Sequence, residues 1–146
     1  MVNPSAQGMQ QVITQALADA NLPPDAIDYV NAHAPAACFQ RAIPISSLKG
    51  YMGHPFGACG ALEAWLCIEM MHAGWLAPTI NLDRVDPRCA QLDYLTEVRP
   101  GQPTYIMSNN FAFGGINTGW QAIGGRSNHG GNPGSYSVRV LAVHQF

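Results

Sequence analysis

The sequence predicts a layered α/β fold, and three observations indicate it. A segment with helical periodicity opens the chain, short segments of β-prone residues alternate with loops, and a long apolar helix occupies the middle. With 146 residues the chain fits one ordinary domain and can bury roughly two-thirds of its unfolded surface.

The first predicted element is a helix over Ser5–Asn21. Ser5 is a suitable N-cap, and Pro23 and Pro24 end the helix. Apolar residues recur along it at helical spacing, at Met9, Val12, Ile13, Ala16, Leu17 and Ala20. A short strand over Asp25–Ala32 follows, and it places His33 at its carboxyl end.

The middle of the chain predicts a strand, a loop and a helix. The strand covers Ile43–Ser47, with Pro44 near its start, and the glycine-rich loop covers Lys49–Gly57. The helix Ala58–His72 is hydrophobic nearly all round, which is typical of a helix that is buried on more than one side. Gly74 is a suitable C-cap for this helix.

The last part of the chain predicts two further strands. An irregular loop over Pro78–Asp93 precedes the strand Thr104–Ser108, and the loop Asn109–Gly115 connects it to a final strand, Ile116–Ile123. Residues 124–146 contain no Asp, Glu or Lys but several Gly and Asn. We therefore expect one domain over residues 1–123 and a mobile tail over residues 124–146.

The composition limits the possible partners and compartments. Charged residues make up only 11% and hydrophobic residues 47%, so we expect another subunit, or another part of the same protein, to cover part of the surface. The net charge of −2 provides no basic stripe for nucleic acid, and no apolar run is long enough to cross a membrane. The N-terminus lacks the pattern of a signal peptide, and four unpaired-looking cysteines indicate a reduced, cytoplasmic protein.

Three segments carry the residues with candidate chemistry: Asn31–His33, Ser46–His54 and Ser108–Asn117. Each follows a predicted strand or opens a predicted helix, and sites in α/β folds gather at the carboxyl ends of strands. We expect the imidazoles of His33 and His54 and the ammonium of Lys49 to converge on one pocket. Such donors suit a developing oxyanion, and Gly114 and Gly115 allow a backbone N–H to approach a ligand closely. The spacing alone leaves open that both histidines are merely packed or solvated.

The same segments resemble a known family. The matching blocks are Ile27–His33, Ser46–Lys49, Gly53–His54, Gly57–Ala61, Pro78–Leu82 and Ser108–Asn117. Their order and approximate spacing resemble the C-terminal part of β-ketoacyl-acyl carrier protein synthases. Within that family, the blocks Leu48–His54 and Ser108–Gly115 look most like ketosynthases of aryl-polyene pathways.

The resemblance implies a thiolase-like α/β fold, of which this chain is mostly the C-terminal half of a layered α/β/α/β/α architecture. It implies decarboxylating condensation of an acyl thioester with malonyl-acyl carrier protein, without a cofactor or metal. His33 and His54 would bind the malonyl carbonyl and stabilise the enolate, with Lys49 supporting them electrostatically. The oxyanion and acyl-gate loop would be formed by Phe113, Phe111, Asn109, Gly114, Gly115 and Asn117. The implied partners are acyl carrier protein, its malonyl and acyl thioesters, and another ketosynthase chain or half.

The sequence also departs from the family pattern. The nucleophilic cysteine of the family lies in the first half, which this chain lacks. The link after His33 is short, and no acidic residue lies between Ala34 and Ala42, where the family carries a helix with carboxylates. We therefore expect Lys49 to lack its usual carboxylate partner.

Other readings of the same residues remain open. Cys59 opens a helix, where a thiol pKa is lowered, and could act as a nucleophile, although a buried small hydrophobe is the favoured reading. A metal site from His33, Cys38, His54 and Cys59 is a further, less favoured reading. The chain could also be a non-catalytic partner of the chain-length-factor kind, or a truncated, inactive fragment.

Overall fold

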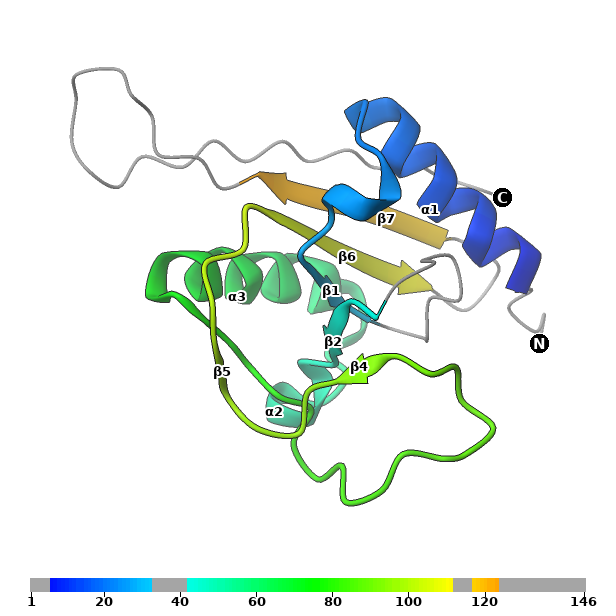
Figure 1. Cartoon of the computed structure of the whole chain (residues 1–146). Coiled ribbons are helices and arrows are strands. Elements are labelled where there is room, and N and C mark those ends of the chain that lie inside the picture. Colours follow the sequence, from blue (N-terminus) through cyan, green and yellow to red (C-terminus); the bar gives the residue numbers. More distant parts are fainter. Residues whose placement is uncertain (1–5, 33–41, 112–116, 124–146) are drawn as a thin grey trace, which may run out of the picture.

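A computed structural model of the chain describes residues 6–32, 42–111 and 117–123. A five-stranded sheet lies between two helices, so the described part has three layers (Figure 1). Helix α1 (Ala6–Ala20) packs along the edge strand, and helix α3 (Cys59–Ala73) packs on the opposite face of the sheet. The predicted layered α/β class is confirmed.

Both long helices were predicted from their apolar spacing. Helix α1 ends at Ala20, before the proline pair, and the predicted N-cap Ser5 lies outside the described residues. Helix α3 ends at Ala73, and Gly74 follows with a left-handed φ of 73° while its N–H donates to the carbonyl of Met70 at 3.0 Å. Gly74 is therefore the C-cap that the sequence predicted.

The sheet has the order β4-β2-β1-β6-β7. Strands β1 (Tyr29–Asn31), β2 (Pro44–Ser46), β4 (Asp93–Tyr94) and β6 (Tyr105–Phe111) are parallel, whereas β7 (Asn117–Ile123) runs antiparallel to β6. The carboxyl ends of the four parallel strands therefore meet at one edge of the sheet.

Short elements complete the described part. Strands β3 (Trp75–Leu76) and β5 (Arg99–Pro100) form a separate antiparallel pair. The 3₁₀ turn η1 (Pro24–Ala26) precedes β1, and helix α2 (Lys49–Met52) and the 3₁₀ turn η2 (Phe56–Ala58) lie between β2 and α3.

Several sequence predictions were wrong in detail. The first strand begins at Tyr29 rather than Asp25, because Pro24–Ala26 form a 3₁₀ turn. Strands β3, β4 and β5 were missed because two-residue strands carry no periodicity. The loop predicted from Asn109 starts later, since pairing with β7 continues to Phe111.

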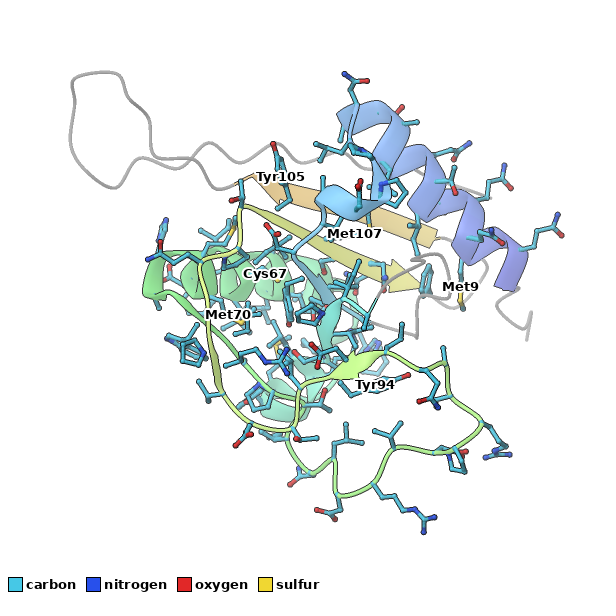
Figure 2. The ribbon with its side chains drawn as sticks, in the orientation of Figure 1. Met9, Cys67, Met70, Tyr94, Tyr105 and Met107 are labelled. Carbon is cyan, nitrogen blue, oxygen red and sulfur yellow. The ribbon has the colours of Figure 1, made fainter. Side chains whose placement is uncertain are left out.

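Apolar side chains pack on both faces of the sheet because successive strand residues point to opposite sides. Tyr29 and Ile106 belong to the core beneath α3, together with Cys67 and Met70, and Figure 2 marks the two α3 residues among the side chains. Their neighbours on the strands belong to the second core, beneath α1, which contains Val30, Met107, Ile13, Leu17, Ile27, Ala32, Ile43 and Ile45. A Cβ at Gly119 of β7 would lie 3.4 Å from Val12 of α1, an ordinary contact distance.

No helix in the described ranges is long and apolar enough to cross a membrane.

Candidate functional site

The three candidate segments meet at the carboxyl edge of the sheet. Asn31, the last residue of β1, is aligned with Ser46 of β2 on one side and with Ser108 of β6 on the other. The Asn31 side chain is fully buried, donates to Ser108 Oγ at 2.8 Å, and accepts from the backbone N–H of Leu48 at 3.3 Å. One amide therefore connects the end of β1 with the middle of β6 and with the turn that leads to Lys49.

A second buried chain of hydrogen bonds fixes the end of β2. Ser46 Oγ donates its hydrogen to the carbonyl of Ala77 at 2.7 Å, so the Tyr29 hydroxyl donates to Ser46 Oγ at 2.6 Å. Burial raises the pKa of Tyr29 far above its ordinary value, and the Tyr29 hydroxyl stays protonated. This chain holds the β2 end against the segment that follows β3.

Lys49 forms an ion pair with Glu63 of α3. The Lys49 side chain is 17% exposed and the Glu63 side chain is fully buried. The expectation that Lys49 lacks a carboxylate partner was therefore wrong. It rested on the missing acid between Ala34 and Ala42, whereas the acid that pairs with Lys49 comes from the long helix, fourteen residues later.

A sequence signal for Glu63 existed and was missed. Cys59, Glu63, Cys67 and Met70 recur at helical spacing, and all four are buried in the structure. A carboxylate placed within the stripe of a helix that faces the core needs a cation or hydrogen-bond donors there.

Cys59 contacts the same carboxylate. Its thiol lies 3.6 Å from Glu63 Oε1 and is buried at the start of α3. Burial, followed by the Glu63 charge, raises the pKa of Cys59, the opposite of the lowering considered for a thiol at a helix N-terminus. A raised pKa leaves the thiol protonated, so a nucleophilic role of Cys59 is disfavoured and the favoured reading as a buried small residue fits.

His54 lies between α2 and η2 and is exposed. Its Nδ1 accepts a hydrogen bond from the backbone N–H of Phe56 at 3.3 Å, and the two rings meet edge to face with centroids 5.6 Å apart. Since Nδ1 accepts, the neutral imidazole carries its hydrogen on Nε2. Phe56 adopts a positive φ of 47°, which is rare for a bulky residue and marks a strained turn beside the histidine.

The acyl-gate residues are described only in part. Phe111 and Asn109 are buried on β6, where the sequence had placed both in a loop. His33, Phe113, Gly114 and Gly115 lie outside the described residues. Asn117 opens β7 and pairs with Phe111, so both ends of the predicted gate segment are anchored in the sheet.

The residues considered for a metal form no metal-binding group within the part of the chain that the structure describes. Cys59 and His54 lie in that part, whereas His33 and Cys38 do not. Cys59, Cys67 and Cys89 are free thiols, and Cys67 is fully buried in the core.

Comparison with known proteins identifies the family. The model of the β-ketoacyl synthase C-terminal domain matches residues 1–40 and 35–83. The chain belongs to the β-ketoacyl synthase family. The 3-oxoacyl-[acyl-carrier-protein] synthase 1 of Escherichia coli K12 is 32% identical over 131 residues, which cover 80% of this chain and 32% of that protein. The resemblance of the chain to the C-terminal domain of β-ketoacyl synthases is thus confirmed.

Solved ketosynthase structures share the fold. A β-ketoacyl synthase from Burkholderia phymatum superposes with a TM-score of 0.78 at 50% identity, covering 83% of this chain and 33% of that one. A ketosynthase from Xenorhabdus doucetiae, solved in complex with its chain length factor, superposes with a TM-score of 0.74 at 30% identity. The match covers 84% of this chain and 35% of that one. The chain therefore has the thiolase-like fold of a ketosynthase C-terminal domain and spans about a third of these relatives.

Proposed function

We propose that this chain supplies the carbonyl-binding part of a decarboxylating 3-oxoacyl-acyl carrier protein synthase. In this proposal His33 and His54 donate hydrogen bonds to the thioester carbonyl of malonyl-acyl carrier protein. Lys49 stabilises the negative charge that develops on this carbonyl oxygen. The backbone N–H of Phe113 donates to the oxyanion that forms on the acyl thioester when the enolate attacks it. Phe111, Asn109, Gly114 and Gly115 shape the acyl gate around it.

The proposed reaction releases carbon dioxide first. The bond between the malonyl Cα and its carboxylate breaks, and the electron pair moves onto the thioester carbonyl oxygen as an enolate. The Nε2–H of His54 is the donor suited to that oxygen, because Nδ1 already accepts from Phe56. The enolate carbon then attacks an acyl thioester on a cysteine of the remaining part of the ketosynthase, and that thiolate leaves.

The observation that carries the proposal is the Lys49–Glu63 pair. An exposed lysine would be screened by water, but here a fully buried carboxylate holds the ammonium of Lys49, on the segment that leads to His54. Buried charges are costly, and a fold that only needs stability has little use for one. A fixed cation and a hydrogen-bond donor on one short segment suit a site where negative charge develops.

An exposed apolar face supports the need for a partner portion. Phe56 is 79% exposed, Trp65 57%, Tyr51 50% and Leu62 37%, and all four lie on α2, η2 or α3. Helix α3 buries its opposite side against the sheet. Proteins rarely leave large apolar patches in water, so we propose that the remaining two-thirds of a ketosynthase covers this face and brings the nucleophilic cysteine.

The test is carbon dioxide release from malonyl-acyl carrier protein. The chain, co-expressed with the N-terminal portion of the Burkholderia phymatum synthase, is expected to release carbon dioxide and form a 3-oxoacyl product. His54→Ala should abolish the release, while His72→Ala, an exposed histidine in the last turn of α3, should not change it. Release that survives His54→Ala would overturn the proposed role of His54.

The partner face has its own test. Trp65→Glu should prevent co-purification of the two portions, because it places a charge in the proposed contact. Trp75→Glu is the matched control, since Trp75 is 40% exposed on β3. Equal loss of co-purification in both variants would contradict this face as the contact. Co-purification without carbon dioxide release would favour a non-catalytic, chain-length-factor-like partner instead.

We further propose that the ketosynthase is of the aryl-polyene type, acts in the cytoplasm, and comprises a domain over residues 1–123 with an appended tail. The Leu48–His54 and Ser108–Gly115 blocks support the type, and the free thiols support a reducing compartment. The reconstituted enzyme should elongate an aromatic polyene thioester faster than a saturated one. A preference for saturated chains would exclude the aryl-polyene type.

A further inference from the structure

A cavity of about 390 Å³ lies at the carboxyl ends of β1, β2 and β4. Its size falls within the range of small-molecule sites. The loop between β3 and β4 forms the outer wall, and in Figure 1 that loop extends away from the sheet. Its walls comprise Ala32, Ile45, Ser46, Ser47, Thr79, Leu82, Arg84, Val85, Asp86, Cys89 and Tyr94.

The walls of this cavity are mainly apolar in character. Ile45, Leu82 and Val85 contribute aliphatic surface, and several polar groups of the lining are already engaged within the protein. Ser46 Oγ bonds to Tyr29 and Ala77, and the Tyr94 hydroxyl donates to the carbonyl of Ala90 at 3.0 Å. Thr79 Oγ1 accepts from the backbone N–H of Ser47 at 2.9 Å. An occupant therefore finds a surface suited to an alkyl chain.

The rim of the cavity carries one uncommitted positive charge. Asp86 is held by Arg88, whose Nε and terminal nitrogen both bond to the carboxylate, and this pair is neutral overall. Arg84 takes part in no ion pair within the described ranges and is exposed at the cavity. A guanidinium binds a carboxylate through two parallel hydrogen bonds.

We propose that this cavity binds an amphipathic carboxylate, the free acid of a medium-length acyl chain. The alkyl chain lies against Ile45, Leu82 and Val85, and the carboxylate pairs with Arg84 at the rim. Neither His54 nor Lys49 lines this cavity, whereas Ala32, the residue before His33, does. The charge complementarity of the rim favours an anion over a neutral lipid, and the apolar wall favours an alkyl chain over a small polar anion.

The test is calorimetric titration of the whole chain with decanoate, with decanol and acetate as comparison ligands. We expect saturable decanoate binding that weakens at least about tenfold in Arg84→Gln, one bidentate charge-assisted contact being worth about that much. Arg99→Gln is the matched control, because Arg99 is committed to Asp93 and neither residue lines the cavity, and it should change the affinity little. Val85→Trp should fill the cavity and abolish binding, with circular dichroism verifying that the fold is retained.

Three results with decanoate would overturn the proposal. They are the absence of saturable decanoate binding, equal weakening in Arg84→Gln and Arg99→Gln, and undiminished binding by a folded Val85→Trp chain. Decanol binding as tight as that of decanoate would exclude the carboxylate contact. Acetate binding of similar strength would exclude the alkyl chain. Because no step involves decarboxylation, each result is independent of the proposed synthase function.

Discussion

Replacing Lys49 by methionine tests the buried ion pair at the centre of the site. Methionine keeps the length of the side chain and removes its charge, so Glu63, which is fully buried, loses its cation. Removing one partner of a buried pair typically costs about 3–5 kcal/mol of stability. The carboxyl can instead take up a proton, which limits the loss. For an ordinary glutamate at pH 7 this protonation costs about 3.7 kcal/mol, since a glutamate in water has a pKa of about 4.3 and each pH unit above it is worth about 1.36 kcal/mol.

The cost of protonating the carboxyl depends on pH, so the loss of stability expected in Lys49→Met also depends on pH. At pH 5 protonation of an ordinary glutamate costs only about 1 kcal/mol, so Lys49→Met should destabilise the chain by about 3 kcal/mol at pH 7 and by about 1 kcal/mol at pH 5. Urea unfolding followed by circular dichroism and tryptophan fluorescence measures both values. Glu69→Gln, on an exposed carboxylate of the same helix, is the control and should change stability by less than about 0.5 kcal/mol.

A double-mutant cycle separates the pair from its surroundings. Lys49→Met combined with Glu63→Gln should recover part of the stability that Lys49→Met loses, because no buried charge remains unpaired. Additive losses in the double variant, or a Lys49→Met effect equal at pH 5 and pH 7, would refute the reasoning.

Three further outcomes follow from the same contacts. Burial raises the pKa of Cys67 far above its ordinary 9.0, so above about pH 9 the unfolded thiol loses its proton while the folded thiol keeps it. The free energy of unfolding should therefore fall above about pH 9 by up to about 1.4 kcal/mol per pH unit. This fall should be less steep in Cys67→Ala when urea midpoints are compared from about pH 8 to about pH 11. Asn31→Leu should cost about 2–3 kcal/mol in the same assay, because Ser108 Oγ and the backbone N–H of Leu48 lose a buried partner, and a loss under about 0.5 kcal/mol would show that this amide does not connect the two strands. Gly50→Ala should lower the thermal midpoint, although alanine favours helices, since its Cβ would lie 2.6 Å from Cγ1 of Ile80; an unchanged or raised midpoint would contradict that contact.

The long elements could be predicted from sequence because their signals are periodic. Helix α3 was found from its apolar run and from Gly74, and β1 and β2 from β-prone residues that precede the candidate segments. The short strands were not, because β4 is defined only by its pairing with β2, a contact between residues far apart in the chain. The extension of β6 to Phe111 was missed for the same reason, because the backbone groups of its last residues are satisfied by pairing with β7.

The sequence could predict which segments form the site, but not which of their side chains are in contact. The sequence placed Asn31, Ser46 and Ser108 at strand ends, and the register aligns them as neighbours. The error over Lys49 arose because its partner was sought near it in the chain. Glu63 approaches from α3, and only the packing of that helix over the sheet brings it to Lys49.

The most direct test of the central claim is a crystal structure of the chain assembled with the N-terminal portion of a ketosynthase and a non-hydrolysable malonyl thioester. The account predicts that Nε2 of His33 and Nε2 of His54 both lie within hydrogen-bonding distance of one carbonyl oxygen, with Lys49 close to the pair. Rings that face different cavities, or a thioester bound away from both, would contradict it.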